Sequence, residues 1–66
     1  MKMSLRAARV NSGLTQKEAA QSIGVSRLSV MFWEDGRKKP KPEHLDSMLR
    51  LYGVSRDDIF LPTKST

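Results

Sequence analysis

The sequence of 66 residues has no cysteine, one histidine and no long apolar run, and each absence excludes a class of protein. Without cysteine the chain forms no disulfide, and His44 alone does not make a four-ligand zinc site, so we expect no metal and no cofactor. No segment approaches the roughly 20 apolar residues that cross a bilayer, and no apolar stretch follows Lys2 as in a secretory signal. We therefore expect a cytoplasmic protein without a membrane partner, in line with its cysteine-free composition.

Signatures of catalysis are also missing, because the sequence has no glycine-rich phosphate loop, carboxylate pair or nucleophile with a matching base. A chain of this length forms one domain and buries only about 60% of its unfolded surface. We expect a single non-enzymatic domain over residues 1–66, with a short C-terminal tail over 62–66. Such a chain leaves no room for a ligand-sensing domain, so we expect no small-molecule ligand.

Basic residues dominate the charge, which is +5, and they are concentrated in one segment. Residues 36–42, called the basic loop below, contain Arg37, Lys38, Lys39 and Lys41 and no acidic residue. The rest of the sequence contains eight basic and seven acidic residues, so its net charge is close to zero. Two prolines and a glycine make this segment stiff. A solvated loop is its ordinary explanation, and a loop that binds phosphates is the functional one.

Apolar spacing and helix-capping residues predict an all-α fold, a compact bundle of five short helices. Trp33 is expected in the core, and His44 on the solvated surface. The predicted helices run from Leu5 to Ser12 after the cap Ser4, from the capping box Thr15–Glu18 to Gly24, from the cap Ser26 to about Glu34, from Pro42 to Gly53, and through a last turn begun by Ser55 that carries Ile59 and Phe60.

The second and third predicted helices are separated by about three residues, Gly24 to Ser26. So tight a connection is typical of a helix-turn-helix motif, here about residues 15–34, although an ordinary pair of antiparallel helices is the structural alternative. The third helix favours the first interpretation. With Val30 and Trp33 facing the core, it exposes large apolar side chains that require a partner: Leu28, Met31 and Phe32 lie outward together with Arg27.

The order of short motifs resembles the lambda-repressor/Cro-like helix-turn-helix family, also called XRE. The motifs are Leu-Thr-Gln-x-x-Ala-Ala from Leu14, Gly-Val-Ser from Gly24, Trp-Glu-Asp-Gly from Trp33, Lys-Pro from Lys39 and Tyr-Gly-Val-Ser from Tyr52. The resemblance spans roughly residues 4–61. The sequence departs from the family pattern at Ala19, usually a larger aliphatic residue, and at the outward apolar positions of the third helix, which are often polar.

The resemblance implies that the third helix, about residues 27–34, reads base edges in the major groove. Arg27 then binds guanine or, alternatively, a phosphate, and Ser29 donates to a base or phosphate or stays within the helix start. Leu28 and Phe32 offer only apolar contact, which suits thymine methyl groups. The alternative for Phe32 is partial burial beside Trp33.

Phosphate contacts are expected from the second helix and the basic loop. The resemblance implies that Gln16 binds a phosphate at the helix N-terminus, although a local cap of backbone amides is an alternative. The resemblance also implies that Arg9, on the inner face of the first helix, forms a structural ion pair with Glu34. The expected phosphate contacts of the loop are Arg37, Lys38, Lys39 and Lys41.

Together these features predict a sequence-specific regulator of transcription, a repressor acting as a homodimer on palindromic double-stranded DNA. Half-sites about one helical turn apart are expected. Phe60 and Leu61, apolar and near the chain end, are candidate dimer contacts, and closure of the core is the alternative role of Phe60. The competing function is a protein-interaction module, antitoxin-like or regulator-binding, that uses the apolar face of the third helix.

Overall fold

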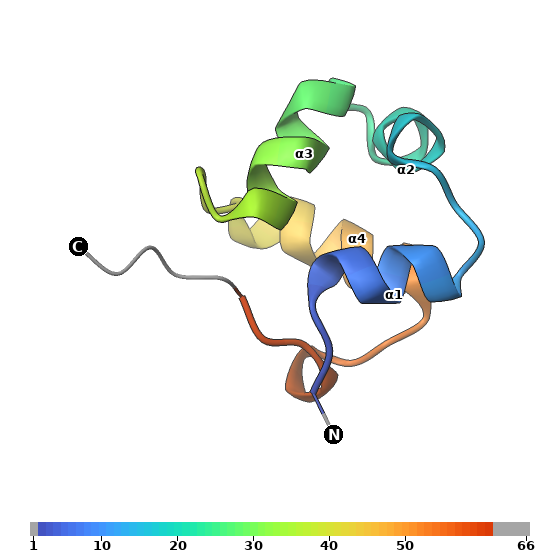
Figure 1. Ribbon diagram of the computed structural model, residues 1–66, viewed down its shortest axis with the longest axis vertical. Helices are drawn as coiled ribbons and strands as arrows, with labels where there is room; N and C mark the ends of the chain where they lie inside the picture. Colours follow the sequence, from blue (N-terminus) through green and yellow to red (C-terminus); the bar gives the residue numbers. More distant parts are fainter. Residues whose placement is uncertain (1, 62–66) are drawn as a thin grey trace.

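The computed structural model describes residues 2–61 and is all-helical, apart from one isolated backbone bridge (Figure 1). The expected all-α fold is confirmed, and the predicted tail over 62–66 lies outside the described residues. The elements are α1 (Leu5–Asn11), α2 (Gln16–Ile23), α3 (Arg27–Asp35), α4 (Pro42–Tyr52) and a single 3-10 turn, η1 (Arg56–Asp58).

Local capping determines where the helices begin. The Ser4 hydroxyl accepts a hydrogen bond from the Ala7 amide at 3.0 Å and starts α1. At α2 the predicted capping box is present: the Glu18 amide donates to Thr15 Oγ1 at 3.0 Å, and the Thr15 amide donates to Glu18 Oε1 at 2.9 Å. Hydrogen bonding from the Thr15 backbone amide, followed by that from its hydroxyl, stabilises the Glu18 carboxylate and holds the pKa of Glu18 below its ordinary value.

The four helices surround one apolar core, with α2 packed on α3 and α4, and α1 packed on the same two helices. Ala19 and Ala20 are both buried, and their small side chains let α2 approach its neighbours closely. Val30 and Trp33, predicted to face the core on the third helix, are both buried. The buried apolar residues are Leu5, Ala8, Ala19, Ala20, Val30, Trp33, Leu45, Met48, Leu49, Tyr52 and Ile59.

The fifth predicted helix is wrong in extent, since η1 is only one 3-10 turn of three residues. Ile59 follows it with extended backbone (φ −116°, ψ 134°) and forms a parallel bridge with Met3. The Met3 amide donates to the Asp58 carbonyl at 2.8 Å, and the Phe60 amide donates to the Met3 carbonyl at 3.1 Å. Pairing with the N-terminal segment thus replaces the helical bonds that would have continued the turn, and it joins the two ends of the described chain (Figure 1).

His44 is half-buried, so its predicted place on the solvated surface is also wrong. Its ring lies 5.1 Å from that of Trp33, centroid to centroid, and Nδ1 is buried without a hydrogen-bond partner among the described residues. His44 precedes Met48 by one helical turn on α4, and therefore shares the face that packs into the core.

Candidate nucleic-acid interface

A three-residue turn connects α2 to α3 and fixes how the two helices cross. Gly24 adopts the left-handed conformation (φ 87°) that ends α2, and the amides of Gly24 and Val25 both donate to the Ala20 carbonyl, at 2.8 and 3.0 Å. Val25 packs against the core. The Ser26 hydroxyl then accepts from the Ser29 amide at 3.1 Å and starts α3. The predicted helix-turn-helix connection is confirmed.

The N-terminal turn of α3 presents its side chains to solvent. Arg27 is exposed, and Leu28 retains 49% of its accessible surface. Ser29 is half-buried, and its hydroxyl lies 3.1 Å from that of Ser26, within the helix cap. Nine helical residues span about 14 Å, close to the roughly 12 Å width of the major groove of B-DNA.

Two of the three apolar side chains expected to be exposed on α3 are instead half-buried. Met31 and Phe32 are partly covered, and only Leu28 is exposed. The Phe32 ring is close to cations of the basic loop, with Arg37 Cζ 5.6 Å and Lys38 Nζ 5.8 Å from its centroid. Spacing along one helix does not reveal these neighbours of Phe32, because they come from a loop that folds back on the helix end.

The basic loop joins the C-terminal end of α3 to the start of α4 (Figure 1). It begins at Gly36 (φ 79°), whose left-handed conformation ends α3, and reaches Pro42 in the first turn of α4. Its four cationic residues are all exposed, and they follow directly on the helix that presents Arg27 and Leu28: Arg37, Lys38, Lys39 and Lys41. The structure therefore combines a helix of groove width with a cluster of exposed positive charge.

A buried ion pair fixes α3 against the first two helices. Arg9 Nε donates to Glu34 Oε2 at 2.6 Å and Nη2 donates to Oε1 at 3.3 Å, with side-chain exposures of 9% and 3%. Arg9 Nη1 also donates to the Leu14 carbonyl at 2.7 Å, and Gln16 Nε2 donates to Glu34 Oε1 at 3.1 Å. The two residues that the family resemblance pairs are thus in direct contact, and Gln16 joins them.

Gln16 therefore has a protein partner that the sequence did not indicate. Its side chain is half-buried at the first position of α2 and bonds across to α3. An amide nitrogen carries two hydrogens, so one N–H remains for another acceptor after the bond to Glu34.

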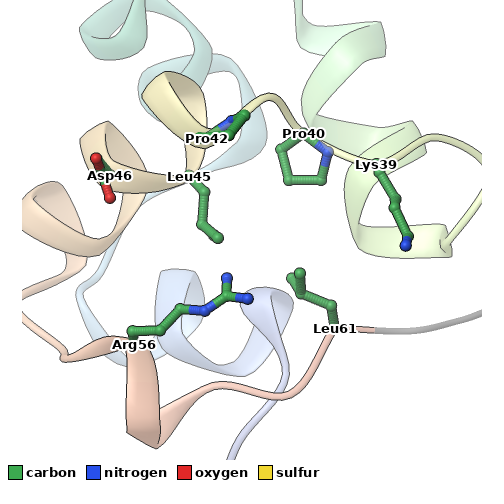
Figure 2. Close-up of a pocket in the computed structure, with 7 residues that line it drawn as sticks. All are labelled: Lys39, Pro40, Pro42, Leu45, Asp46, Arg56 and Leu61. Atoms are coloured by element: carbon green, nitrogen blue, oxygen red, sulfur yellow. The ribbon is translucent and has the colours of Figure 1, made fainter.

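A pocket of about 380 Å³ lies beside the basic loop, between the start of α4 and the chain around η1 (Figure 2). Figure 2 shows Arg56 extending its guanidinium toward the space below Leu45, while Leu61 enters from the C-terminal side. The lining of the pocket mixes aliphatic, proline and charged side chains: Lys39, Pro40, Pro42, Leu45, Asp46, Arg56 and Leu61.

The two candidate dimer residues differ in their surroundings. Leu61 packs against the core, whereas Phe60 is 49% exposed. The backbone bridge explains this difference, because it holds the chain extended from Ile59 and consecutive side chains then point to opposite sides. Buried Ile59 and partly buried Leu61 face inward, and Phe60 faces outward.

Within residues 2–61, no group of three His, Cys, Asp or Glu side chains is arranged to hold a metal ion. The helices of this same part of the chain are too short and too polar to cross a membrane.

The sequence is also similar to those of known helix-turn-helix proteins. The family model of a helix-turn-helix domain matches residues 3–59. An uncharacterized HTH-type transcriptional regulator of Methanocaldococcus jannaschii is 33% identical over 61 residues, covering 92% of this chain and 92% of that protein. A similarly named protein of Archaeoglobus fulgidus is 30% identical over 61 residues, covering 92% and 87%. The cryptic phage CTXphi transcriptional repressor of Vibrio cholerae is 36% identical over 50 residues, covering 76% of this chain and 45% of the repressor.

Proposed function

Because this chain belongs to the lambda-repressor/Cro-like (XRE) helix-turn-helix family and is a DNA-binding transcriptional regulator, we propose that it represses transcription with α3 in the major groove of an operator. The observation that carries this proposal is the placement of the exposed N-terminal turn of α3 and the exposed basic loop at the two ends of one groove-width helix. The similarity to a phage repressor supports repression rather than activation.

The base-reading set is Arg27, Leu28, Ser29 and Phe32. Arg27 is exposed and carries a fork of donors that fits O6 and N7 of guanine. Leu28 is the most exposed apolar side chain of α3 and suits a thymine methyl group. Ser29 reaches a base or phosphate by rotating its hydroxyl away from Ser26. Phe32, one turn further along, offers the edge of its half-buried ring.

The DNA backbone is bound by Arg37, Lys38, Lys39 and Lys41, and by Gln16 at the N-terminus of α2. The helix dipole favours an anion at this N-terminus. While one N–H of the Gln16 amide bonds Glu34, the other is available to a phosphate oxygen. Gln16 thereby connects the DNA backbone to the buried Arg9–Glu34 pair, which keeps α3 at a fixed position relative to the phosphate.

A protein of this class acts by binding, without catalysis, and meets DNA in the cytoplasm. One module contacts few base pairs, so a homodimer on a palindrome with half-sites about 34 Å apart supplies the specificity. Phe60, exposed beside the chain end, is the dimer contact, with Leu61 next to it.

Selection of bound sequences from random duplex DNA tests this function. Enrichment of a palindrome that contains a guanine and neighbouring thymines in each half-site is expected. Failure to enrich any sequence, combined with binding that does not depend on salt, would contradict the proposal. Tight and saturable capture of one protein partner under the same conditions would instead identify a protein-interaction module.

A further inference from the structure

Phe32 occupies the junction between α3 and the basic loop, and both its backbone and its ring contact that loop. Its carbonyl accepts the amide of Gly36 and that of Arg37, the latter at 2.9 Å. The Lys38 amide is also directed at this carbonyl, at 3.4 Å. The path of the loop is thereby fixed on the last turn of α3.

The side chains of the same loop residues then return to the ring. Arg37 Cζ lies 5.6 Å and Lys38 Nζ 5.8 Å from the ring centroid, both within the roughly 6 Å at which a cation is attracted to an aromatic face. Both side chains are nevertheless exposed, so their charged groups remain accessible to an anion. Phe32 is not among the apolar side chains that pack on the core, so its ring is available for contact with the side chains of the loop.

We propose that Phe32 is a positioning residue for DNA-backbone binding: its ring holds the Arg37 and Lys38 cations in place beside α3, ready for phosphates. This inference rests on the proposed function of the basic loop. Long side chains lose conformational freedom when they bind, and partial ordering beforehand reduces that loss. The contribution of the ring is therefore independent of base sequence, unlike a contact between Phe32 and a thymine methyl group.

The substitution Phe32→Leu tests the proposal, because leucine keeps an apolar side chain but offers no aromatic face. We expect binding to random duplexes to weaken by roughly three- to ten-fold, since two cations lose their ordering, and the operator to show at least this loss, with the lost base contact of Phe32 added. We also expect the slope of log K against log salt to stay close to wild type, because Arg37 and Lys38 remain and each phosphate contact still contributes about 0.9. Phe32→Tyr keeps the ring and should behave as wild type in both respects.

A measurement on the free protein separates this inference from the proposed function. The side-chain methylene protons of Arg37 and Lys38 should show upfield ring-current shifts in NMR spectra, retained in Phe32→Tyr and lost in Phe32→Leu. If the wild type binds no duplex but shows these shifts, the proposed function fails while the ring contact remains. If the shifts are absent, or if Phe32→Leu binds all duplexes with the wild-type affinity, the positioning role is overturned.

Two further results complete the test. Adding Phe32→Leu to Arg37→Ala/Lys38→Ala should cause little additional loss, because the ring acts through those two side chains. A loss confined to one thymine position would instead assign Phe32 to base reading alone and overturn the inference. Thermal unfolding of each variant establishes that the compared proteins are folded.

Discussion

The Glu34 carboxylate accepts hydrogen bonds from three side-chain nitrogens, Arg9 Nε and Nη2 and Gln16 Nε2, while its own side chain is only 3% exposed. These bonds connect the C-terminal half of α3 with α1 and with the first residue of α2. A buried charge requires such partners, since the cost of removing it from water is otherwise large. A single acidic residue thereby fixes the position of the proposed DNA-reading helix.

Replacing Arg9 by alanine should destabilise the domain by about 3–5 kcal/mol, because Glu34 would remain buried without its cation. A shift of 1 kcal/mol lowers the melting temperature of so small a domain by about 4–8 °C, so most of the variant should be unfolded on moderate warming. Arg6→Ala, an exposed arginine on the same helix, is the matched control and should melt close to wild type. Equal melting temperatures for the two variants would contradict the structural role of the pair.

Tyr52 gives the domain a specific sensitivity to alkali. Burial, with the nearby Glu34 carboxylate, raises the pKa of Tyr52 from 10.0 to about 12. The folded state holds this proton more tightly than the unfolded state, so the stabilisation is complete below pH 10 and is lost as pH rises from 10 to 12. The loss should amount to roughly 2–3 kcal/mol.

The matched variant is Tyr52→Phe, which has no proton to lose in this range. The Tyr52 Oη has no hydrogen-bond partner within residues 2–61, so removing this hydroxyl should cost little stability at neutral pH. Denaturant unfolding of both proteins between pH 9 and 12 checks the prediction. A parallel decline of wild type and variant would exclude Tyr52 as the cause.

Arg27 is the residue expected to carry base discrimination. Arg27→Ala should cost about 1–3 kcal/mol on the selected operator and relax the preference at one position, while the salt slope falls by at most about one. Replacing the thymine opposite Leu28 by uracil removes only a methyl group, and Leu28→Ala should then add little further loss. Uniform weakening of Arg27→Ala on every sequence would reassign this arginine to a phosphate.

At the scale of elements, helix boundaries followed from short local signals. Ser4, the Thr15–Glu18 box and Ser26 each satisfy free amides at a helix start, and such bonds depend on neighbours within three residues. The extent of η1 did not follow, because the pairing of Ile59 with Met3 joins residues from opposite ends of the chain. The basic loop was evident from its charge, but its contact with the Phe32 ring was not.

The basic loop should dominate the salt dependence of DNA binding. Lys38→Ala/Lys39→Ala is expected to weaken binding to all duplexes alike and to reduce the log–log salt slope by about 0.9 for each phosphate that the variant no longer binds. Arg6→Ala/Arg50→Ala, which removes two exposed arginines of α1 and α4 outside this loop, is the control for the change in net charge. Titrations at several salt concentrations measure both quantities, and an unchanged slope in a folded variant would remove the loop from the interface.

At the scale of the whole molecule, the backbone bridge turns Phe60 outward and leaves it 49% exposed. We expect the protein to be a dimer at least on DNA, with two chains bound to each saturated palindrome. Phe60→Ser should weaken dimerisation and operator binding without a comparable loss of stability, since the side chain is outside the core. Sedimentation and the stoichiometry on duplex DNA check this, and one chain per saturated palindrome would contradict it.

The sequence by itself determined four of the five predicted helices, the side-chain caps of the first three, the three-residue turn and the concentration of charge in one loop. These depend on periodicity and on bonds between near neighbours, which a linear pattern records. The tertiary structure decided the contacts made across elements. Examples are the bond of Gln16 to Glu34, the burial of His44 beside Trp33 and the outward side of Phe60. Such contacts depend on how packed helices and paired backbones bring distant residues together, and no local spacing encodes that placement.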